Sequence, residues 1–176
     1  MRSPGAGRAV PGAAATRGRL AVTAAAVAVL ASGCGGSSTP STSAAGSGHS
    51  PVTVIARSLG HLGTVLVNAQ GQALYMFAPD SRQHITCTGV CAVTWPPLRL
   101  PAGARFAAGR GVSAALLGSD PDPAGGRVVT YDGWPLYTYV GDVQPGQTTG
   151  QAINLNGGDW YLMQPSGKPL TAGSPA

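Results

Sequence analysis

The sequence contains no glutamate, and charged residues make up only 10% of its 176 residues. Glycine and proline contribute 27 and 15 residues, about a quarter of the chain. A coiled coil or another long-helix protein is therefore excluded, because such proteins are rich in charged helix formers and poor in turn formers. The chain also has no Gly-x-Ser-x-Gly motif and no glycine-rich phosphate loop ahead of a helix. We therefore expect a protein that is not an enzyme, and we assign no catalytic residue and no cofactor.

Aromatic residues are few, at 6% of the chain, and all of them lie between Tyr75 and Tyr161. The hydrophobic core is therefore expected in this part of the chain. The length allows one domain, and the many turn formers with clustered aromatics favour a small all-β domain over an α/β enzyme fold.

Residues 1–33 have the pattern of a removable signal peptide. Four arginines and no acidic residue precede an apolar run of about eleven residues that begins at Leu20. A helix that spans a bilayer needs roughly twenty apolar residues, so this run is too short for a permanent membrane span. The pattern predicts a segment that directs export and is then cleaved.

A cysteine directly follows the small residues at the end of this run. The stretch Leu30-Ala-Ser-Gly-Cys34 resembles the lipobox of bacterial lipoproteins. By this resemblance, Cys34 carries a diacylglyceryl group and the new N-terminus can receive a further acyl chain such as palmitate. Two or more chains suffice for stable anchoring, which implies a lipoprotein held on the outer face of the bacterial cell membrane. In the alternative, the protein is secreted without an anchor and Cys34 has no role.

The rest of the chain divides into three parts. Residues 34–51 contain Cys34 and a flexible tether of glycine, serine and threonine, residues 52–165 form the domain, and residues 166–176 form a disordered tail. Removal of four arginines leaves seven basic residues against six aspartates, so the mature chain has a charge near +1. No basic cluster interleaved with aromatics remains, and we expect no nucleic-acid partner.

The domain contains an internal repeat. Residues 65–80 match residues 128–142, and both copies end in Tyr-x-aromatic-x-x-Asp. Each copy reads as a strand, a tight turn and a second strand, and Asp132-Gly133 predicts a type I′ hairpin turn in the second copy. We expect a small barrel or sandwich built from two pseudo-repeated β-hairpin units, with one helical turn over 112–117. The motif residues are Tyr75, Phe77 and Asp80 in the first copy and Tyr137, Tyr139 and Asp142 in the second.

Alternation along a strand places Tyr75 and Phe77 on one face and Leu74 and Met76 on the other. The second copy repeats this arrangement. A tryptophan follows each motif, and we expect these two residues, Trp95 and Trp160, to cover the aromatic faces of the hairpins. Buried packing of all these rings is one interpretation. The alternative is a shallow binding face for sugar rings, a planar cofactor such as haem, or another protein.

The two motif aspartates, Asp80 and Asp142, lie just past a strand end, where a carboxylate can accept backbone amides and cap a turn. A pair of hydrolase carboxylates is the alternative. Two further aspartates, Asp120 and Asp122, alternate with prolines, which predicts a rigid exposed loop and not a calcium site.

Several motifs in the same order resemble the bacterial family described as a secreted repeat of unknown function, with its repeated Tyr-x-(Phe/Trp/Tyr)-x-x-Asp motif. The resemblance spans about residues 59–165 and implies a secreted or surface lipoprotein, but no activity. The motifs that carry it are Leu62-Gly-Thr64, Cys87-Thr-Gly-Val-Cys-Ala92, Trp95-Pro-Pro-Leu98, Val129-Thr-Tyr-Asp-Gly-Trp-Pro-Leu-Tyr137 and Gly158-Asp-Trp-Tyr161.

Cys87 and Cys91 are the remaining thiols of a protein expected in an oxidising compartment, and we expect them to form a disulfide. A redox-active pair is the alternative. His84 could complete a metal triad with them, for copper in particular, but a fourth ligand is missing and we assign no metal site. The expected function is a binding module for an unknown envelope protein or small ligand. The alternative is a redox or metal-handling lipoprotein, of a copper or haem type, that uses the two cysteines.

Overall fold

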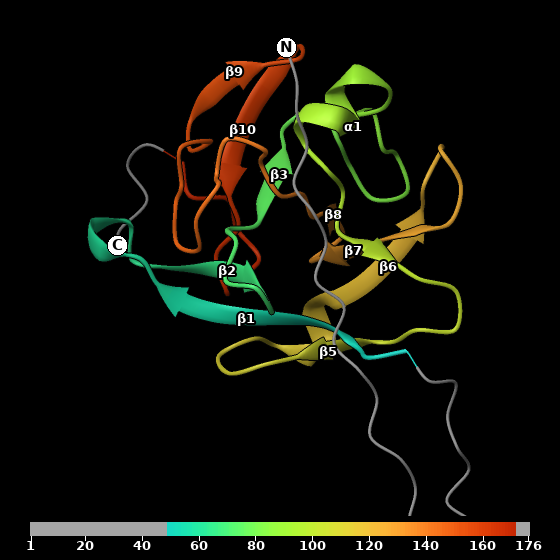
Figure 1. Ribbon diagram of the computed structural model, residues 1–176, viewed down its shortest axis with the longest axis horizontal. Helices are drawn as coiled ribbons and strands as arrows, with labels where there is room; N and C mark the ends of the chain where they lie inside the picture. Colours follow the sequence, from blue (N-terminus) through green and yellow to red (C-terminus); the bar gives the residue numbers. More distant parts are fainter. Residues whose placement is uncertain (1–48, 172–176) are drawn as a thin grey trace, which may run out of the picture. The chain divides into compact units, whose positions relative to one another are not determined.

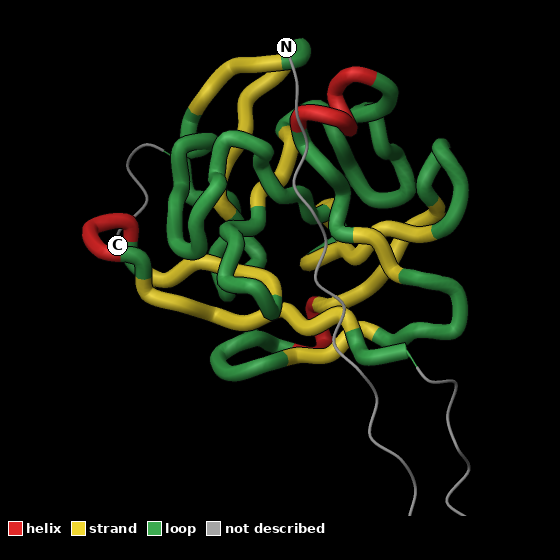
Figure 2. Tube along the Cα trace, in the orientation of Figure 1, coloured by secondary structure: helices red, strands yellow, loops and turns green. Residues whose placement is uncertain are grey.

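The structure is a computed structural model that describes residues 49–171 (Figure 1). The predicted signal peptide, Cys34 and nearly all of the tether lie outside these residues. Strands make up most of the regular secondary structure, which confirms the predicted all-β class, and the helices are single turns (Figure 2). The strands are β1 (Val52–Ser58), β2 (Thr64–Asn68), β3 (Tyr75–Phe77), β4 (Arg99–Leu100), β5 (Phe106–Ala108), β6 (Leu117–Pro121), β7 (Arg127–Tyr131), β8 (Trp134–Pro135), β9 (Ile153–Leu155) and β10 (Gly158–Leu162), and the helices are η1 (Gly60–Leu62), α1 (Val90–Thr94) and η2 (Ala114–Leu116).

The strands form three small sheets. Their orders are β2-β1-β5, β3-β10-β9 and β4-β7-β6, and β8 also pairs with β7. Among the described strands, only β1 and β5 pair in parallel; the other pairs are antiparallel. None of the sheets in the described part of the chain closes into a barrel, so the architecture is sandwich-like. The helical turn predicted over 112–117 is present as η2.

The predicted hairpin turn of the second repeat joins β7 and β8. Asp132 and Gly133 have φ values of 49° and 82°, the positive values that a type I′ turn requires. The sequence carries the same type of turn signal at Asn156-Gly157. These two residues have φ values of 57° and 92° and join β9 to β10.

The two repeats have the same backbone arrangement, as predicted. In the first, three amides form a closed cycle of hydrogen bonds: Leu66 donates to Met163, Met163 donates to Leu74 and Leu74 donates back to Leu66, at 2.8, 2.9 and 2.9 Å. The second repeat has an equivalent cycle of Val129, Leu98 and Leu136, at 2.8, 2.8 and 3.0 Å. Each cycle therefore joins a repeat to the segment that follows a motif tryptophan, since Met163 follows Trp160 and Leu98 follows Trp95.

The repeats meet at their motif tyrosines. Tyr75 and Tyr137 are antiparallel bridge partners whose amides each donate to the other's carbonyl, at 2.8 and 2.9 Å. Because the bonds are reciprocal, an approximate twofold axis that relates the repeats passes between these two residues.

Alternation along the motif strands fills two cores, as the sequence predicts. Tyr75 and Phe77 lie in an aromatic core with the disulfide and both motif tryptophans. Leu74 and Met76 lie in a second core of aliphatic side chains with Tyr131. Both faces of the first motif strand are therefore buried.

The packed chain extends beyond Pro165, where we expected the domain to end. Leu170 is buried in the aromatic core, and its amide donates to Leu162 at 2.8 Å. Pro169 also pairs with Met163. The start of the predicted tail therefore belongs to the domain. The sequence did not predict this contact because Leu170 stands among small polar residues.

Candidate functional site

The motif tyrosines and aspartates are bonded across the two repeats. The hydroxyl of Tyr75 donates to Oδ2 of Asp142 at 2.7 Å, and the hydroxyl of Tyr137 donates to Oδ2 of Asp80. All four residues are buried, with at most 3% of their surface exposed. Each of these tyrosines is therefore bonded to the motif aspartate of the other repeat.

The second oxygen of each aspartate binds a threonine. Oδ1 of Asp80 accepts the amide and the hydroxyl of Thr86, both at 2.7 Å. Oδ1 of Asp142 accepts the same two groups of Thr149, at 2.8 and 2.7 Å. Both carboxylates thus cap the turn that follows them, and neither has a free oxygen for hydrolytic chemistry. The sequence signal for these two caps is the threonine that lies six or seven residues after each aspartate.

Burial raises the pKa of both motif tyrosines well above the ordinary value, and the carboxylate next to each hydroxyl raises it further. For Tyr75 the carboxylate is Asp142, and for Tyr137 it is Asp80. Both phenols therefore stay protonated and act as hydrogen-bond donors.

Four aromatic rings form one continuous stack. Trp95 and Trp160 lie face to face, with centroids 3.8 Å apart and planes inclined by 3°. Phe77 stacks on the far side of Trp160 at 4.3 Å, and Tyr139 stacks on the far side of Trp95 at 4.2 Å. Each tryptophan thus covers the ring of the other repeat.

The motif tyrosines meet the stack edge to face. Tyr75 contacts Trp95 with centroids 5.3 Å apart, and Tyr137 contacts Trp160 at 5.2 Å. Both tyrosines and both tryptophans are fully buried, and Tyr139 is half-buried. The alternative of an open binding face made of these rings is therefore wrong, because the rings pack on each other.

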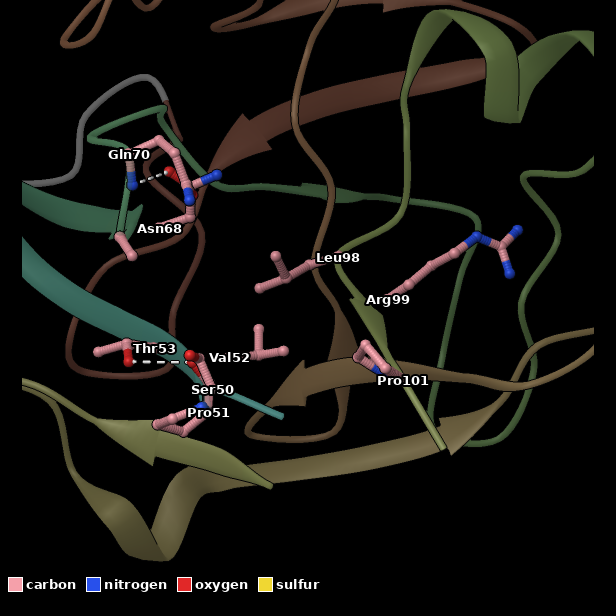
Figure 3. Close-up of a pocket in the computed structure, with 10 residues that line it drawn as sticks. Ser50, Pro51, Val52, Thr53, Asn68, Gln70, Leu98, Arg99 and Pro101 are labelled. Carbon is pink, nitrogen blue, oxygen red and sulfur yellow. Dashed lines mark hydrogen bonds between the residues drawn. The ribbon is translucent and has the colours of Figure 1, made fainter. Parts of the chain in front are cut away.

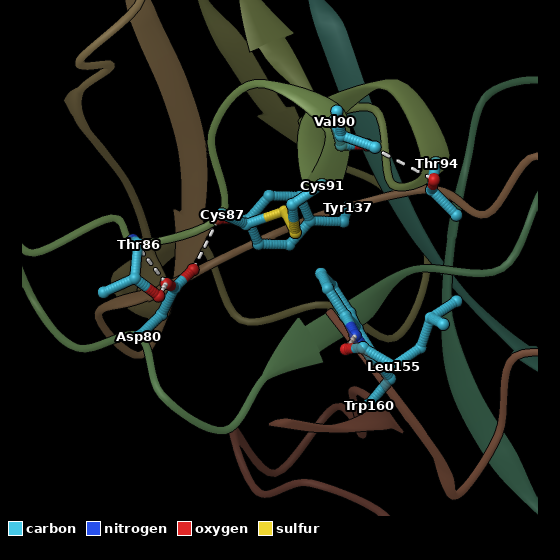
Figure 4. Close-up of a disulfide and its surroundings, with 9 residues drawn as sticks. All are labelled: Asp80, Thr86, Cys87, Val90, Cys91, Thr94, Tyr137, Leu155 and Trp160. Carbon is cyan, nitrogen blue, oxygen red and sulfur yellow. Dashed lines mark hydrogen bonds between the residues drawn. A yellow bond between two sulfur atoms is a disulfide. The ribbon is translucent and has the colours of Figure 1, made fainter. Parts of the chain in front are cut away.

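Cys87 and Cys91 form the expected disulfide, with Cα atoms 5.2 Å apart. Gly89, with a φ of 56°, precedes α1 and lets the chain turn back between them. Both cysteines belong to the aromatic core, and Figure 4 shows the disulfide beside Tyr137 and Trp160. The proposed triad with His84 is not available while the sulfurs are bonded to each other, and residues 49–171 hold no group of three potential metal ligands.

The indole nitrogens of the two tryptophans differ. Nε1 of Trp160 donates to the carbonyl of Leu155 at 3.0 Å, in the β9–β10 hairpin. Nε1 of Trp95 is buried and has no hydrogen-bond partner among residues 49–171. The first repeat has the helical turn α1 in place of a hairpin, and carbonyls of that turn accept other groups: Cys91 accepts the amide of Trp95, and Thr94 accepts the amide of Val140.

Asp120 and Asp122 are buried, with 8% and 9% of their surface exposed, so the expectation of an exposed loop is wrong for these side chains. Oδ2 of Asp120 accepts the amide of Gln83 at 2.8 Å. Asp122 forms an ion pair with Arg99 at 2.8 Å and accepts the amide of Ala124.

A groove of about 320 Å³ lies where β1 begins (Figure 3). In Figure 3 the Arg99 side chain extends away from the other lining residues, and its guanidinium bonds Asp122 and the carbonyl of Gly125. The groove therefore presents mainly uncharged groups. Its lining consists of Ser50, Pro51, Val52, Thr53, Asn68, Ala69, Gln70, Leu98, Arg99 and Pro101.

The outer side of α1 carries exposed valines. Val90 and Val93 are 77% and 73% exposed, and Val140 is 55% exposed. The amide of Val140 donates to the carbonyl of Thr94 at the end of α1, so these three residues, the valine patch, lie close together. The two segments that carry them, residues 85–98 and 133–141, contain no aspartate, lysine, arginine or histidine. In Figure 1, α1 lies far from the start of β1, where the tether joins the domain.

Comparisons with known proteins identify one family. Its model matches residues 57–99 and 120–164, which contain the two repeats, and describes a secreted repeat of unknown function. Comparison with curated proteins and with solved structures finds no significant match. No helix in residues 49–171 is long and apolar enough to span a membrane. The protein therefore belongs to the family of the secreted repeat of unknown function, which places it outside the cytoplasm.

Proposed function

We propose that the protein is a lipid-anchored module of the cell envelope that binds a partner protein through the valine patch, a role that requires no enzymatic step. The exposure of Val90 and Val93 carries this proposal. Exposed apolar side chains that lie together mark protein interaction sites, whereas single ones are common on any surface. The buried motif residues, in contrast, are engaged with each other.

The chemistry of the valine patch favours a neutral protein surface as its partner. The patch lies on segments without charged side chains, so it offers no ion pair to a charged polymer or a nucleic acid. A protein interface, in contrast, gains from the burial of apolar groups with few charges at its centre. The convex outer side of a helical turn also suits a protein better than a small ligand, which needs a concave site.

The anchor supports the same function. Leu30-Ala-Ser-Gly-Cys34 resembles a lipobox, and the tether that follows would hold the domain on the order of 20–25 Å from the lipid.

Site-specific photo-crosslinking on intact cells tests the binding function. A photoreactive residue at Val93 should give one discrete adduct with a protein, and the same residue at Val143 should not. Val143 is a matched control because it is also 73% exposed but lies beyond the Asp142 turn. The double variant Val90→Asp/Val93→Asp should abolish the adduct formed at position 140 without lowering the melting temperature, since surface substitutions change stability by about 0.5 kcal/mol or less. Equal adducts at positions 93 and 143, or none, would contradict the proposal.

Mass spectrometry of the N-terminal peptide of the mature protein tests the anchor. We expect Cys34 to be the first residue and to carry acyl mass, and the variant Cys34→Ala should appear in the culture medium. An unmodified Cys34 peptide from the wild-type protein would show that the protein is secreted without an anchor.

A second candidate is a redox or metal-handling function of Cys87 and Cys91. One observation favours it: Cys91 lies in α1, whose Val90 and Val93 are exposed, so only one helical turn separates the disulfide from solvent. Thiol titration across a series of redox buffers tests this function. Reduction at a mild potential, followed by binding of copper to the free thiols, would support it, and a disulfide that resists the glutathione range would exclude it.

A further inference from the structure

Only one end of the four-ring stack both reaches the surface of the domain and carries a ring that is easily oxidised. Tyr139, at one end, is half-buried and stacks on Trp95 at 4.2 Å. Phe77, at the other end, is 3% exposed and carries a phenyl ring, which is far harder to oxidise than a phenol or an indole. Between them Trp95 and Trp160 overlap at 3.8 Å, close enough to share the loss of one electron.

A proton acceptor accompanies each of the two phenols beside the stack. A phenol gives up an electron readily only when its proton leaves with the electron, because the phenol radical cation is a very strong acid. Tyr137 is bonded to Oδ2 of Asp80, and Tyr75 is bonded to Oδ2 of Asp142 at 2.7 Å. Both phenols touch the indoles edge to face, and burial keeps them protonated at rest by raising their pKa.

Tyr131 shows that a carboxylate partner is not a general requirement for a buried tyrosine in this fold. It is also fully buried, but its hydroxyl donates to the carbonyl of Pro165 at 2.8 Å, and a carbonyl is too weak a base to take a phenolic proton. Of the three fully buried tyrosines in the described residues, only the two that meet the tryptophans edge to face are bonded to a carboxylate. Tyr161 is only partly buried, and its hydroxyl donates to Oδ2 of Asp159 at the longer distance of 3.4 Å.

We propose that the aromatic core is a proton-coupled electron store that reduces one-electron oxidants, such as oxygen-centred or organic radicals, at the surface of the domain. The oxidant takes one electron through Tyr139 from the Trp95–Trp160 pair and becomes its one-electron-reduced form. The pair is left as an indole radical cation.

The adjacent tyrosine then refills the pair. Tyr137 passes one electron to the indole radical cation and its hydroxyl proton to Oδ2 of Asp80. The products are a neutral indole, a neutral phenoxyl radical and a protonated carboxyl group. Tyr75 and Asp142 store a second oxidising equivalent in the same way. A quinol or enediol donor restores the phenol by giving one electron through the same stack, and the aspartate returns the proton.

Flash photolysis of the full-length protein with a photogenerated ruthenium(III) polypyridyl oxidant tests this proposal. Transient absorption should show the indole radical first and the phenoxyl radical second, and freeze-quenched samples should give a tyrosyl signal in electron paramagnetic resonance. In the variant Asp80→Asn/Asp142→Asn, phenoxyl formation should be at least about tenfold slower, because the loss of one charged hydrogen-bond partner changes a barrier by about that factor. The control Tyr131→Phe should leave both signals unchanged.

A second variant tests the route if the double aspartate variant does not fold. Tyr139→Phe reproduces at one end of the stack the ring that Phe77 already provides at the other, so it should fold normally. Removal of this entry residue should slow indole oxidation about tenfold, equivalent to a barrier higher by about 1.4 kcal/mol. The proposal is wrong if Tyr139→Phe oxidises at the wild-type rate. It is also wrong if a folded Asp80→Asn/Asp142→Asn variant forms the phenoxyl radical as fast as the wild type. Neither result would affect the crosslinking test of the valine patch.

Discussion

The two repeats share one core but close it in different ways. After Asp80, the first repeat forms a disulfide and the helical turn α1 before it reaches Trp95. After Asp142, the second repeat reaches Trp160 through the β9–β10 hairpin and has no cysteine. In spite of this difference the threonine caps, the tyrosine bonds and the ring contacts are equivalent. The core geometry is therefore specified by the motif residues, and the connecting loops are free to differ.

Alkaline pH tests whether the two tyrosine–aspartate pairs are equal. Above the ordinary tyrosine pKa of 10.0, the unfolded chain loses phenolic protons that the folded protein keeps, because burial raises the pKa of Tyr75 and Tyr137. A raised pKa in the folded state means that stability is complete below pH 10 and falls as the pH rises. The expected loss is about 1.4 kcal/mol per pH unit for each tyrosine. Denaturant titrations over a series of alkaline pH values measure this slope.

The same denaturant titrations of Tyr75→Phe and Tyr137→Phe show how much each tyrosine contributes to this slope. Each variant should lose half of the slope, since the two phenols have equivalent surroundings. A slope that depends on only one of them would show that the repeats differ in the core as well as in the loops.

The disulfide is the largest difference between the loops. Removal of both sulfurs in Cys87→Ala/Cys91→Ala should destabilise the domain by about 2 kcal/mol, the value for closure of a short loop. Melting of the wild-type protein with and without a reductant should give the same difference. A variant that fails to fold would mean that the first repeat depends on its covalent bond for the whole core.

The smallest expected effect concerns the indole nitrogens. Trp160→Phe leaves the carbonyl of Leu155 without its donor, whereas Trp95→Phe removes a buried N–H that has no partner. Each tryptophan has three ring contacts. The hydrogen bond is therefore the main difference, and Trp160→Phe should cost about 1 kcal/mol more than Trp95→Phe. Equal losses in urea denaturation would show that Trp95 has a hydrogen-bond partner in solution, such as a water molecule.

Local features of the fold could be predicted from the sequence. The alternation around Tyr75 and the Asp132-Gly133 turn depend on neighbouring residues only, and both were confirmed. The disulfide was also confirmed, and it too is a local feature, since its two cysteines are only four residues apart.

Contacts between distant residues could not be predicted in the same way. Tyr75 and Asp142 are 67 residues apart, and no local pattern says which repeat supplies the partner of each phenol. The burial of Asp120 and Asp122 has the same cause, because Gln83 and Arg99 lie 37 and 23 residues away along the chain. Leu170 was missed because a single apolar residue among small polar ones gives no periodic signal.

The contacts between the two repeats have a consequence for the export of the protein. Trp160 and the Met163 strand, near the end of the chain, complete both the ring stack and the backbone cycle of the first repeat. Nothing translated earlier can substitute for them. We therefore expect the first repeat to stay incompletely folded until these residues have been synthesised, so a chain exported during its synthesis would cross the membrane before the domain folds.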